Sequence, residues 1–245
     1  EDVEEWKKLG AESICLDRHL VRNFGQLKAL RNADKDMEFI LLVNDPCRLN
    51  CPIERIHDYQ MSDASISKKE YFHCCSFSCL RDFIQDPEKM IGSTYIRPED
   101  LKAYESLGIN CFKVVDRNRT TKFILNAVNA YMNRSYDGNL FDLMSLFGSY
   151  DREKALPDKL NVNDLSVKTI DRFWKELPSM INLSLDNKKI DGYLQHMAEK
   201  ECESGCGRCK VCSDYCNLVE FDKRAAEIVK RNIDLILIDK NGTKA

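Results

Sequence analysis

The sequence feature that most limits the fold is a repeated unit of helix, glycine and strand. The stretches EEWKKLGAESICLDR (4–18) and KAYESLGINCFKVVDR (102–117) share an amphipathic helical pattern, a Leu-Gly stop, an apolar run and a terminal Asp-Arg pair. A glycine at this point is typical of a helix end that needs a positive φ angle. Helices that alternate with short apolar strands favour a parallel sheet, as in successive units of a (β/α) barrel.

Further segments of the same kind fill the first part of the chain. We expect strands at 12–17, 38–44, 93–96 and 110–116, and helices at 2–10, 23–33, 97–108 and 120–134. Asn23 would cap the second helix and Pro98 would lie in the first turn of the third. Four strand units make half of an eight-stranded barrel. We therefore expect the second half of a barrel, with the other half lying upstream or supplied by a partner chain.

The predicted fold class is α/β, with two regions of different character. Residues 1–150 would form the barrel portion, with a cysteine-rich insertion at 45–90, and residues 151–245 a helical region with a cysteine cluster at 202–216. Barrels of this kind carry their functional residues at the carboxyl ends of the strands. In this sequence those ends hold Asp17 and Arg18, the segment 44–51, Arg97, and Asp116 with Arg117.

Composition and charge exclude several classes of protein. The net charge of −3 argues against a nucleic-acid binder that works through global charge, although a local basic groove remains compatible with it. The sequence has no run of eighteen apolar residues and no signal-peptide pattern, so we expect no membrane span. Ten of the 12 cysteines gather in groups with short spacings, which suits metal binding better than disulfides. A reducing, cytoplasmic location is the expected one.

The first group of cysteines follows the apolar strand at 38–44. Cys47 and Cys51 have the same three-residue spacing as Cys75 and Cys79, and Cys74 adds a fifth thiol. Thiolates are the ligands that iron–sulfur clusters and structural zinc prefer. Because zinc knuckles more often use two-residue spacing, the pattern favours a [4Fe–4S] cluster. The simpler alternative is a set of buried, unreactive cysteines.

The second group lies near the end of the chain. Its five members are Cys202, Cys206, Cys209, Cys212 and Cys216. The last four follow the C-x2-C-x2-C-x3-C spacing of bacterial ferredoxins, but Asn217 stands where a ferredoxin has proline. A second cluster and a zinc site both fit this pattern. The helical pattern at 221–232 would dock against the rest of the protein.

Three segments resemble the second half of the collagenase-like peptidase family U32. They are LLVNDPCRLNCPIERIHDYQ (41–60), STYIRPEDLKAYESLGINCFKVVDRNR (93–119) and NAYMNRSYDGNLFDLM (129–144). The family name records a proteolytic assignment, and some relatives are iron–sulfur proteins needed for oxygen-independent hydroxylation of ubiquinone precursors or RNA bases. The resemblance implies a cluster held by Cys47, Cys51, Cys79 and one of Cys74 and Cys75. It also implies functional roles for Lys113, Arg117, Arg97 and His57.

The departures from the family pattern limit what the resemblance implies about substrate. Asp116 stands where the family usually has glycine before the arginine, and it would change the charge of the pocket or pair with Arg117.

The predicted function is therefore an iron–sulfur-dependent hydroxylation or redox modification, by an enzyme or a subunit of one. Lys113, Arg117 and Arg97 would bind an anionic small molecule or nucleobase-type substrate, and His57 would act as a general acid. Expected partners are that substrate and a second U32-like subunit or electron donor. A U32-type peptidase, a non-catalytic electron-transfer subunit and a zinc-stabilised barrel remain alternatives.

Overall fold

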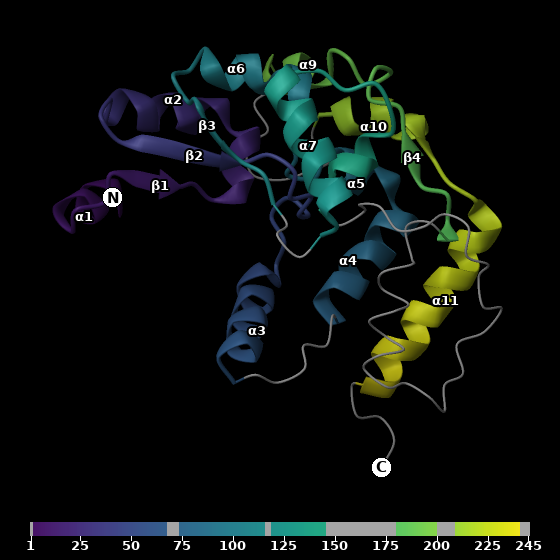
Figure 1. Cartoon of the computed structure of the whole chain (residues 1–245). Helices are drawn as coiled ribbons and strands as arrows, with labels where there is room; N and C mark the ends of the chain where they lie inside the picture. The colour runs from purple at the N-terminus through teal and green to yellow at the C-terminus, as the bar shows by residue number, and fades with distance from the viewer. Residues whose placement is uncertain (1, 68–73, 116–118, 146–179, 200–208, 241–245) are drawn as a thin grey trace.

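The structure is a computed structural model that describes residues 2–67, 74–115, 119–145, 180–199 and 209–240 (Figure 1). Five strands are assigned in these ranges: β1 (Ser13–Cys15), β2 (Glu38–Leu42), β3 (Cys111–Lys113), β4 (Ser184–Leu185) and β5 (Val219–Glu220). The α-helices before residue 150 are α1 (Asp2–Lys8), α2 (Phe24–Ala33), α3 (Glu54–Ser67), α4 (Cys74–Gln85), α5 (Pro87–Ile91), α6 (Leu101–Glu105) and α7 (Thr121–Asn133). Three more follow: α9 (Tyr193–Glu199), α10 (Val211–Tyr215) and α11 (Lys223–Lys240). Short 3-10 helices are η1 (Arg18–Arg22), η2 (Pro98–Asp100), η3 (Leu140–Leu143) and η5 (Cys216–Leu218).

The first three strands form a parallel sheet in the order β1-β2-β3. Cys15 pairs with Ile40 in the register of β1 and β2, and Ile40 pairs in turn with Cys111 of β3. The expected α/β class with a parallel sheet is therefore confirmed. These strands do not close into a barrel within the described residues, so the barrel itself stays a prediction.

The two copies of the repeated unit flank the central strand. Each helix, α1 and α6, ends shortly before a glycine in the left-handed region, with φ +89° at Gly10 and φ +85° at Gly108. The strands that follow, β1 and β3, lie on opposite sides of β2. The repeat therefore builds both outer strands of the sheet, and the predicted helix ends are confirmed. β1 is more exposed than expected, because it lies at an edge of the sheet.

The expected strand at 93–96 is not a strand in the structure. Its residues are buried, but they meet the segment after β2 at separate points. The Ile96 N–H donates to the Val43 carbonyl at 2.8 Å, and the Thr94 N–H donates to the Cys47 carbonyl at 2.9 Å. A turn-like bond from the Tyr95 N–H to the Ser93 carbonyl, 3.0 Å long, interrupts any regular ladder. The segment is therefore an apolar loop that closes over the end of the central strand.

The later part of the chain packs on the same hydrophobic core. β4 and β5 form an antiparallel pair, and α10 contacts α5 and α9. The long helix α11 runs beside α4 (Figure 1), and the ion pair between Arg81 Nε and Asp234 Oδ1, at 2.5 Å, joins the two. Buried side chains from before residue 150 and after residue 180 form one cluster. None of the described helices is both long enough and apolar enough to cross a membrane.

Asn44 fixes the place where the chain leaves the central strand. Its buried side chain donates from Nδ2 to the Leu143 carbonyl at 3.0 Å and to the Val115 carbonyl, while Oδ1 accepts from the Val115 N–H at 2.7 Å. The Ser145 N–H donates to the Asn44 carbonyl at 2.9 Å. A single amide thus joins the ends of β2 and β3 to the segment after η3.

We predict that Asn44→Ala lowers the free energy of unfolding by about 3 kcal/mol, because it leaves buried backbone groups without partners. Urea unfolding of the purified protein measures the change. Asn110→Ala is the matched control, since Asn110 is exposed before β3, and it should change stability by about 0.5 kcal/mol or less. Equal stability losses in the two variants would contradict the role given to Asn44.

Candidate functional site

The loop after β2 carries the first two cysteines of the predicted cluster site. The Cys47 N–H donates to Thr94 Oγ1 at 3.0 Å and to the Asp45 carbonyl at 2.9 Å. The Thr94 hydroxyl donates in turn to the Asp45 carbonyl at 2.8 Å. Thr94 is buried, so this small network holds the backbone of Cys47 at the carboxyl end of the sheet.

The other two cysteines come from α4. Cys75 and Cys79 are four residues apart, which places them on one face of the helix. Arg48, in the cysteine loop, pairs with Asp82 of α4 through Nη1 and Oδ2 at 2.7 Å and so holds the loop against the helix. Cys74 is the first residue of α4, but its side chain is outside the described part.

Cys79 lies near the other three thiols of the predicted site. Its pKa is raised to about 12, first by burial and then by Cys51 and Cys75. Burial also raises the pKa of Cys47 to about 12, and Cys51 and Cys79 add to this effect while Arg18 opposes it. Cys75 Sγ donates to Gln60 Oε1 of α3 at 3.4 Å, so α3 closes one side of the group. The structure therefore brings together Cys47, Cys51, Cys75 and Cys79.

The spacing of the sulfurs bears on which metal the group could hold. Tetrahedral zinc with bonds of about 2.3 Å holds its sulfurs about 3.8 Å apart. Among the described residues, no three of these cysteines have sulfurs that all lie within 4.8 Å of one another. An iron–sulfur cube separates its thiolates more widely, because each one binds a different iron. Four free thiols, of which Cys75 is buried and the other three are partly buried, are a donor set that fits such a cube.

A charged rim borders Cys47. Arg18, just after β1, pairs through Nη1 with Asp45 at 3.2 Å and through Nε with Glu54 at 3.1 Å. Its Nη2 lies 3.5 Å from Asp58 of α3. Three carboxylates thus surround one guanidinium, which limits how well Arg18 could bind an added anion. Burial raises the pKa of Asp45, and this effect exceeds the opposite influence of Arg18.

A histidine lies beside the same rim. His19 Nε2 is 2.6 Å from Glu54 Oε2, and the Asn50 N–H donates to His19 Nδ1 at 3.3 Å. Asp17 Oδ1 accepts from the His19 backbone N–H at 2.8 Å. One side-chain oxygen or nitrogen atom from each of Asp17, His19 and Glu54 lies within 4.8 Å of the other two. Each of them already has a protein partner, and the arrangement serves to position the turn after β1.

The predicted catalytic residues fall into different environments. Lys113 is the last residue of β3, and its exposed side chain forms no ion pair with any described residue. His57 lies on α3, and partial burial lowers its pKa. Arg97 is buried and pairs with Asp100 at 2.9 Å and Asp191 at 2.8 Å. Arg97 is therefore committed to ion pairs within the fold, while Arg117 lies outside the described residues.

The second group of cysteines is described only from Cys209 onward, because Cys202 and Cys206 lie outside the described ranges. Cys212 is buried on α10, and its Sγ is 3.3 Å from Tyr193 Oη. Cys209 precedes this helix and Cys216 begins η5, both partly buried. Each of these three cysteines packs in or against the hydrophobic core.

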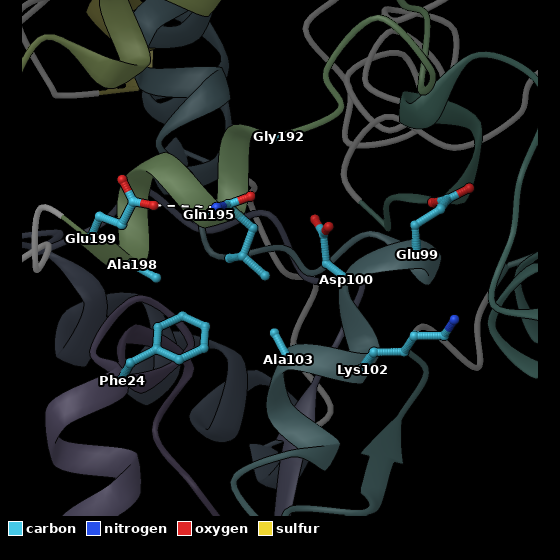
Figure 2. A pocket seen from close by; sticks show the side chains of 10 residues that line it. Phe24, Glu99, Asp100, Lys102, Ala103, Gly192, Gln195, Ala198 and Glu199 are labelled. Carbon is cyan, nitrogen blue, oxygen red and sulfur yellow. Dashed lines mark hydrogen bonds between the residues drawn. The ribbon is translucent and has the colours of Figure 1, made fainter.

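A pocket of about 590 Å³ opens elsewhere on the molecule, between α2, α6 and α9 (Figure 2). Figure 2 shows Asp100, Gln195 and Glu199 around its upper part and Phe24 below. Its charged lining residues are Glu99, Asp100, Glu199 and Lys102. None of the cysteines that the structure describes lines it, and its acidic character does not suit the anionic substrate expected from the sequence.

Comparison with known proteins gives one informative match. The chain is 26% identical over 213 residues to an uncharacterized protease of Methanocaldococcus jannaschii, and the match covers 85% of this chain. It covers 53% of the relative, so the chain spans about half the length of the curated relative that it matches. No family model and no solved structure matches. The match to a protein named a protease supports the expected relationship to a protease-like family of the U32 type.

Several residues of the site were not predicted from the sequence. Thr94, Asp45, His19 and Glu54 shape the loop and its charged rim, yet none belongs to a motif that singles it out. Asp45 directly follows the predicted strand end and His19 follows the Asp-Arg pair, so position along the strands was the available signal.

We predict that Thr94→Val loosens the cysteine loop, because it removes the hydroxyl that bonds both Cys47 and Asp45. Losing about 1.4 kcal/mol of such bonding corresponds to about tenfold more frequent opening. Thiol labelling of the metal-free protein, mapped to Cys47 by mass spectrometry, should accelerate accordingly. Thr94→Ser keeps the hydroxyl and should leave the labelling rate near that of wild type. Equal rates in the two variants would mean that the hydroxyl does not hold the loop.

Proposed function

We propose that the chain is an iron–sulfur protein that carries out oxygen-independent redox modification, either as an enzyme or as a subunit of one. The substrate class that fits best is a small anionic or nucleobase-type molecule. The observation that carries the proposal is the convergence of four cysteines from two separate segments, centred on Cys79. The similarity to a protein named an uncharacterized protease supports a relationship to the U32 type, which is compatible with the proposal.

The donor set supports a [4Fe–4S] cluster in particular. Cys47 and Cys51 would hold it from the loop after β2, and Cys75 and Cys79 from α4. All four are reduced, and none bonds to another as a disulfide. When bound, a cluster of this kind supplies single-electron transfer at low potential. The hydrogen bonds at Thr94 and the Arg48–Asp82 ion pair keep the two ligand segments together.

The remaining side chains suggest how a substrate would bind. Because the strands are parallel, Arg18, the cysteine loop and Lys113 lie at the same edge of the sheet, after β1, β2 and at the end of β3. Three carboxylates neutralise Arg18, whereas Lys113 is exposed and has no ion-pair partner among the described residues. We therefore assign the anchoring of a substrate anion to Lys113. His57 is on α3, close to Arg18 and Asp58, and because burial lowers its pKa it would act at neutral pH as a proton acceptor instead of the general acid expected from the sequence.

A peptidase is the second candidate, favoured by the name of the relative. A cysteine nucleophile needs a thiolate, and proteins create one by lowering the pKa of the thiol. In this site burial raises the pKa of Cys47 and Cys79 to about 12 instead. These thiols suit metal binding more than nucleophilic attack. A peptidase would cleave casein or gelatin without iron and would be blocked by thiol reagents.

We predict that anaerobically purified wild-type protein holds about four more irons and about four more sulfides per chain than Cys47→Ala or Cys79→Ala. Cys15→Ala is the control, since Cys15 is exposed on the edge strand and should keep the full content. Iron and sulfide analysis with an EPR spectrum after dithionite gives the measurement. Cys75→Ala and Cys74→Ala, compared in the same way, identify the ligand of that pair.

The outcomes separate the alternatives. Equal iron and sulfide in wild type, Cys47→Ala and Cys79→Ala would refute the cluster. If the wild type holds one zinc per chain and no sulfide, and Cys47→Ala lacks that zinc, the result would indicate a zinc-stabilised fold. A cluster with a reversible redox couple, together with no effect of Lys113→Met on binding of carboxylate or phosphate probes, would point to a non-catalytic electron-transfer subunit.

A further inference from the structure

Arg22 is a buried cation whose counter-charge is missing from the described part of the protein. It ends η1, and its side chain is 2% exposed. Nε and Nη2 both donate to the Ser93 carbonyl, at 3.1 and 2.5 Å. No described carboxylate pairs with it, in contrast to the buried Arg97, which has two. Burying a charge without an opposite charge is costly, so an anion is expected close to Arg22.

The side chains around Arg22 narrow the source of that anion. Its guanidinium lies over the rings of Tyr95 and Tyr193, 4.9 and 5.4 Å from their centres. Aromatic faces attract a cation, but phenols are neutral at physiological pH, and burial raises the pKa of Tyr95 to about 12. The titratable side chains within electrostatic reach of the buried Arg22 are Tyr193, Tyr95, Tyr104 and Cys212. Of these four groups, the cysteine is the one that becomes an anion by binding a metal.

Cys212 is well placed for this role. It is buried, and its Sγ lies 3.3 Å from Tyr193 Oη, the same tyrosine whose ring faces Arg22. Cys209 lies three residues before it and Cys216 four residues after it. Tyr95 Oη is buried with no hydrogen-bond partner among the described atoms, which leaves a donor beside the guanidinium. A cation, an unused donor and a buried cysteine are therefore linked through Tyr95 and Tyr193, and two further cysteines lie within four residues of Cys212 in the sequence.

We propose that Cys209, Cys212 and Cys216 form a second metal–thiolate centre and that the buried Arg22 is its counter-charge. On binding, each thiol loses its proton to solvent as the bond from sulfur to metal forms, so the centre gains the negative charge that Arg22 lacks. Either zinc or an iron–sulfur cluster supplies this thiolate charge, because both bind cysteine as the thiolate. As in the first group, the three described sulfurs do not all lie within 4.8 Å of one another, so zinc would have to draw them closer together. The centre is separate from the four cysteines around Cys79 and does not depend on the function proposed for them.

The test is a double-mutant cycle on the anaerobically purified full chain, followed by thermal unfolding. Removing one member of a buried charge pair destabilises a protein strongly, whereas replacing both members by apolar groups is often tolerated. We therefore expect Arg22→Met to lower the melting temperature of the wild type but to raise that of Cys212→Ala. A double mutant that melts at or below the temperature of Cys212→Ala would overturn the proposal.

A second variant separates the charge of Arg22 from its hydrogen bond. Arg22→Gln is neutral but can still donate to the Ser93 carbonyl, so the same order of melting temperatures is expected with it. It also keeps the test decisive if Arg22→Met does not fold. Arg97→Met is the matched control, because its partners are Asp100 and Asp191, and it should destabilise Cys212→Ala as it does the wild type.

Elemental analysis identifies the metal. Cys212→Ala should lose either zinc, or iron together with sulfide, while Cys15→Ala keeps the wild-type content. Unchanged zinc and iron in Cys212→Ala would overturn the proposal. Repeating the Arg22 cycle in a Cys47→Ala background distinguishes the two sites, since the pattern of melting temperatures should persist when the first group no longer binds metal.

Discussion

The site depends on how the chain leaves the central strand of the sheet. At that point the backbone can no longer pair in the ladder, and buried side chains take over the hydrogen bonds. Asn44 binds backbone groups at 115 and 143, and Thr94 binds the backbone at 45 and 47. Cys47 follows within three residues, so its position is determined by these two side chains rather than by regular secondary structure. An irregular loop becomes a fixed platform because each of these buried polar groups has a partner.

Buried polar groups in this protein are compensated in three different ways. The buried Arg97 is neutralised by two carboxylates, which argues for a structural role. The thiols of Cys47 and Cys79 are largely buried, and burial raises the pKa of each to about 12, which reflects the cost of charging them without a metal. Arg22 has aromatic faces and a carbonyl but no carboxylate among the described residues. The comparison indicates that Arg22 is expected to have a further anionic partner, whereas Arg97 needs none.

Much of the local structure followed from the sequence, because it rests on interactions between near neighbours. The helix cap at Asn23, the left-handed Gly10 and Gly108, and the apolar runs that form β1, β2 and β3 can be recognised from residues within a few positions, although the strands pair with distant partners. The spacing of Cys75 and Cys79 indicated a shared ligand role, whereas the helix α4 that places them on one face was not predicted. The segment at 93–96 was misread as a strand because its apolar character reflects burial against β2, which a loop satisfies equally well. The pairing of Arg97 with Asp191 and of Arg22 with Ser93 could not be predicted for another reason, since these partners lie about 70 or more residues away in the sequence.

The position of α11 links distant parts of the chain. Cys79 lies on one side of α4, and Arg81, two residues on, faces roughly the opposite way and pairs with Asp234 of α11. The helix α4, which carries two of the thiols, therefore packs against α11, near the end of the described chain (Figure 1). Shortening or displacing α11 would let α4 shift against the cysteine loop and change the separation of the sulfurs without touching any of them. By supporting α4, the helix α11 therefore helps to determine the positions of Cys75 and Cys79.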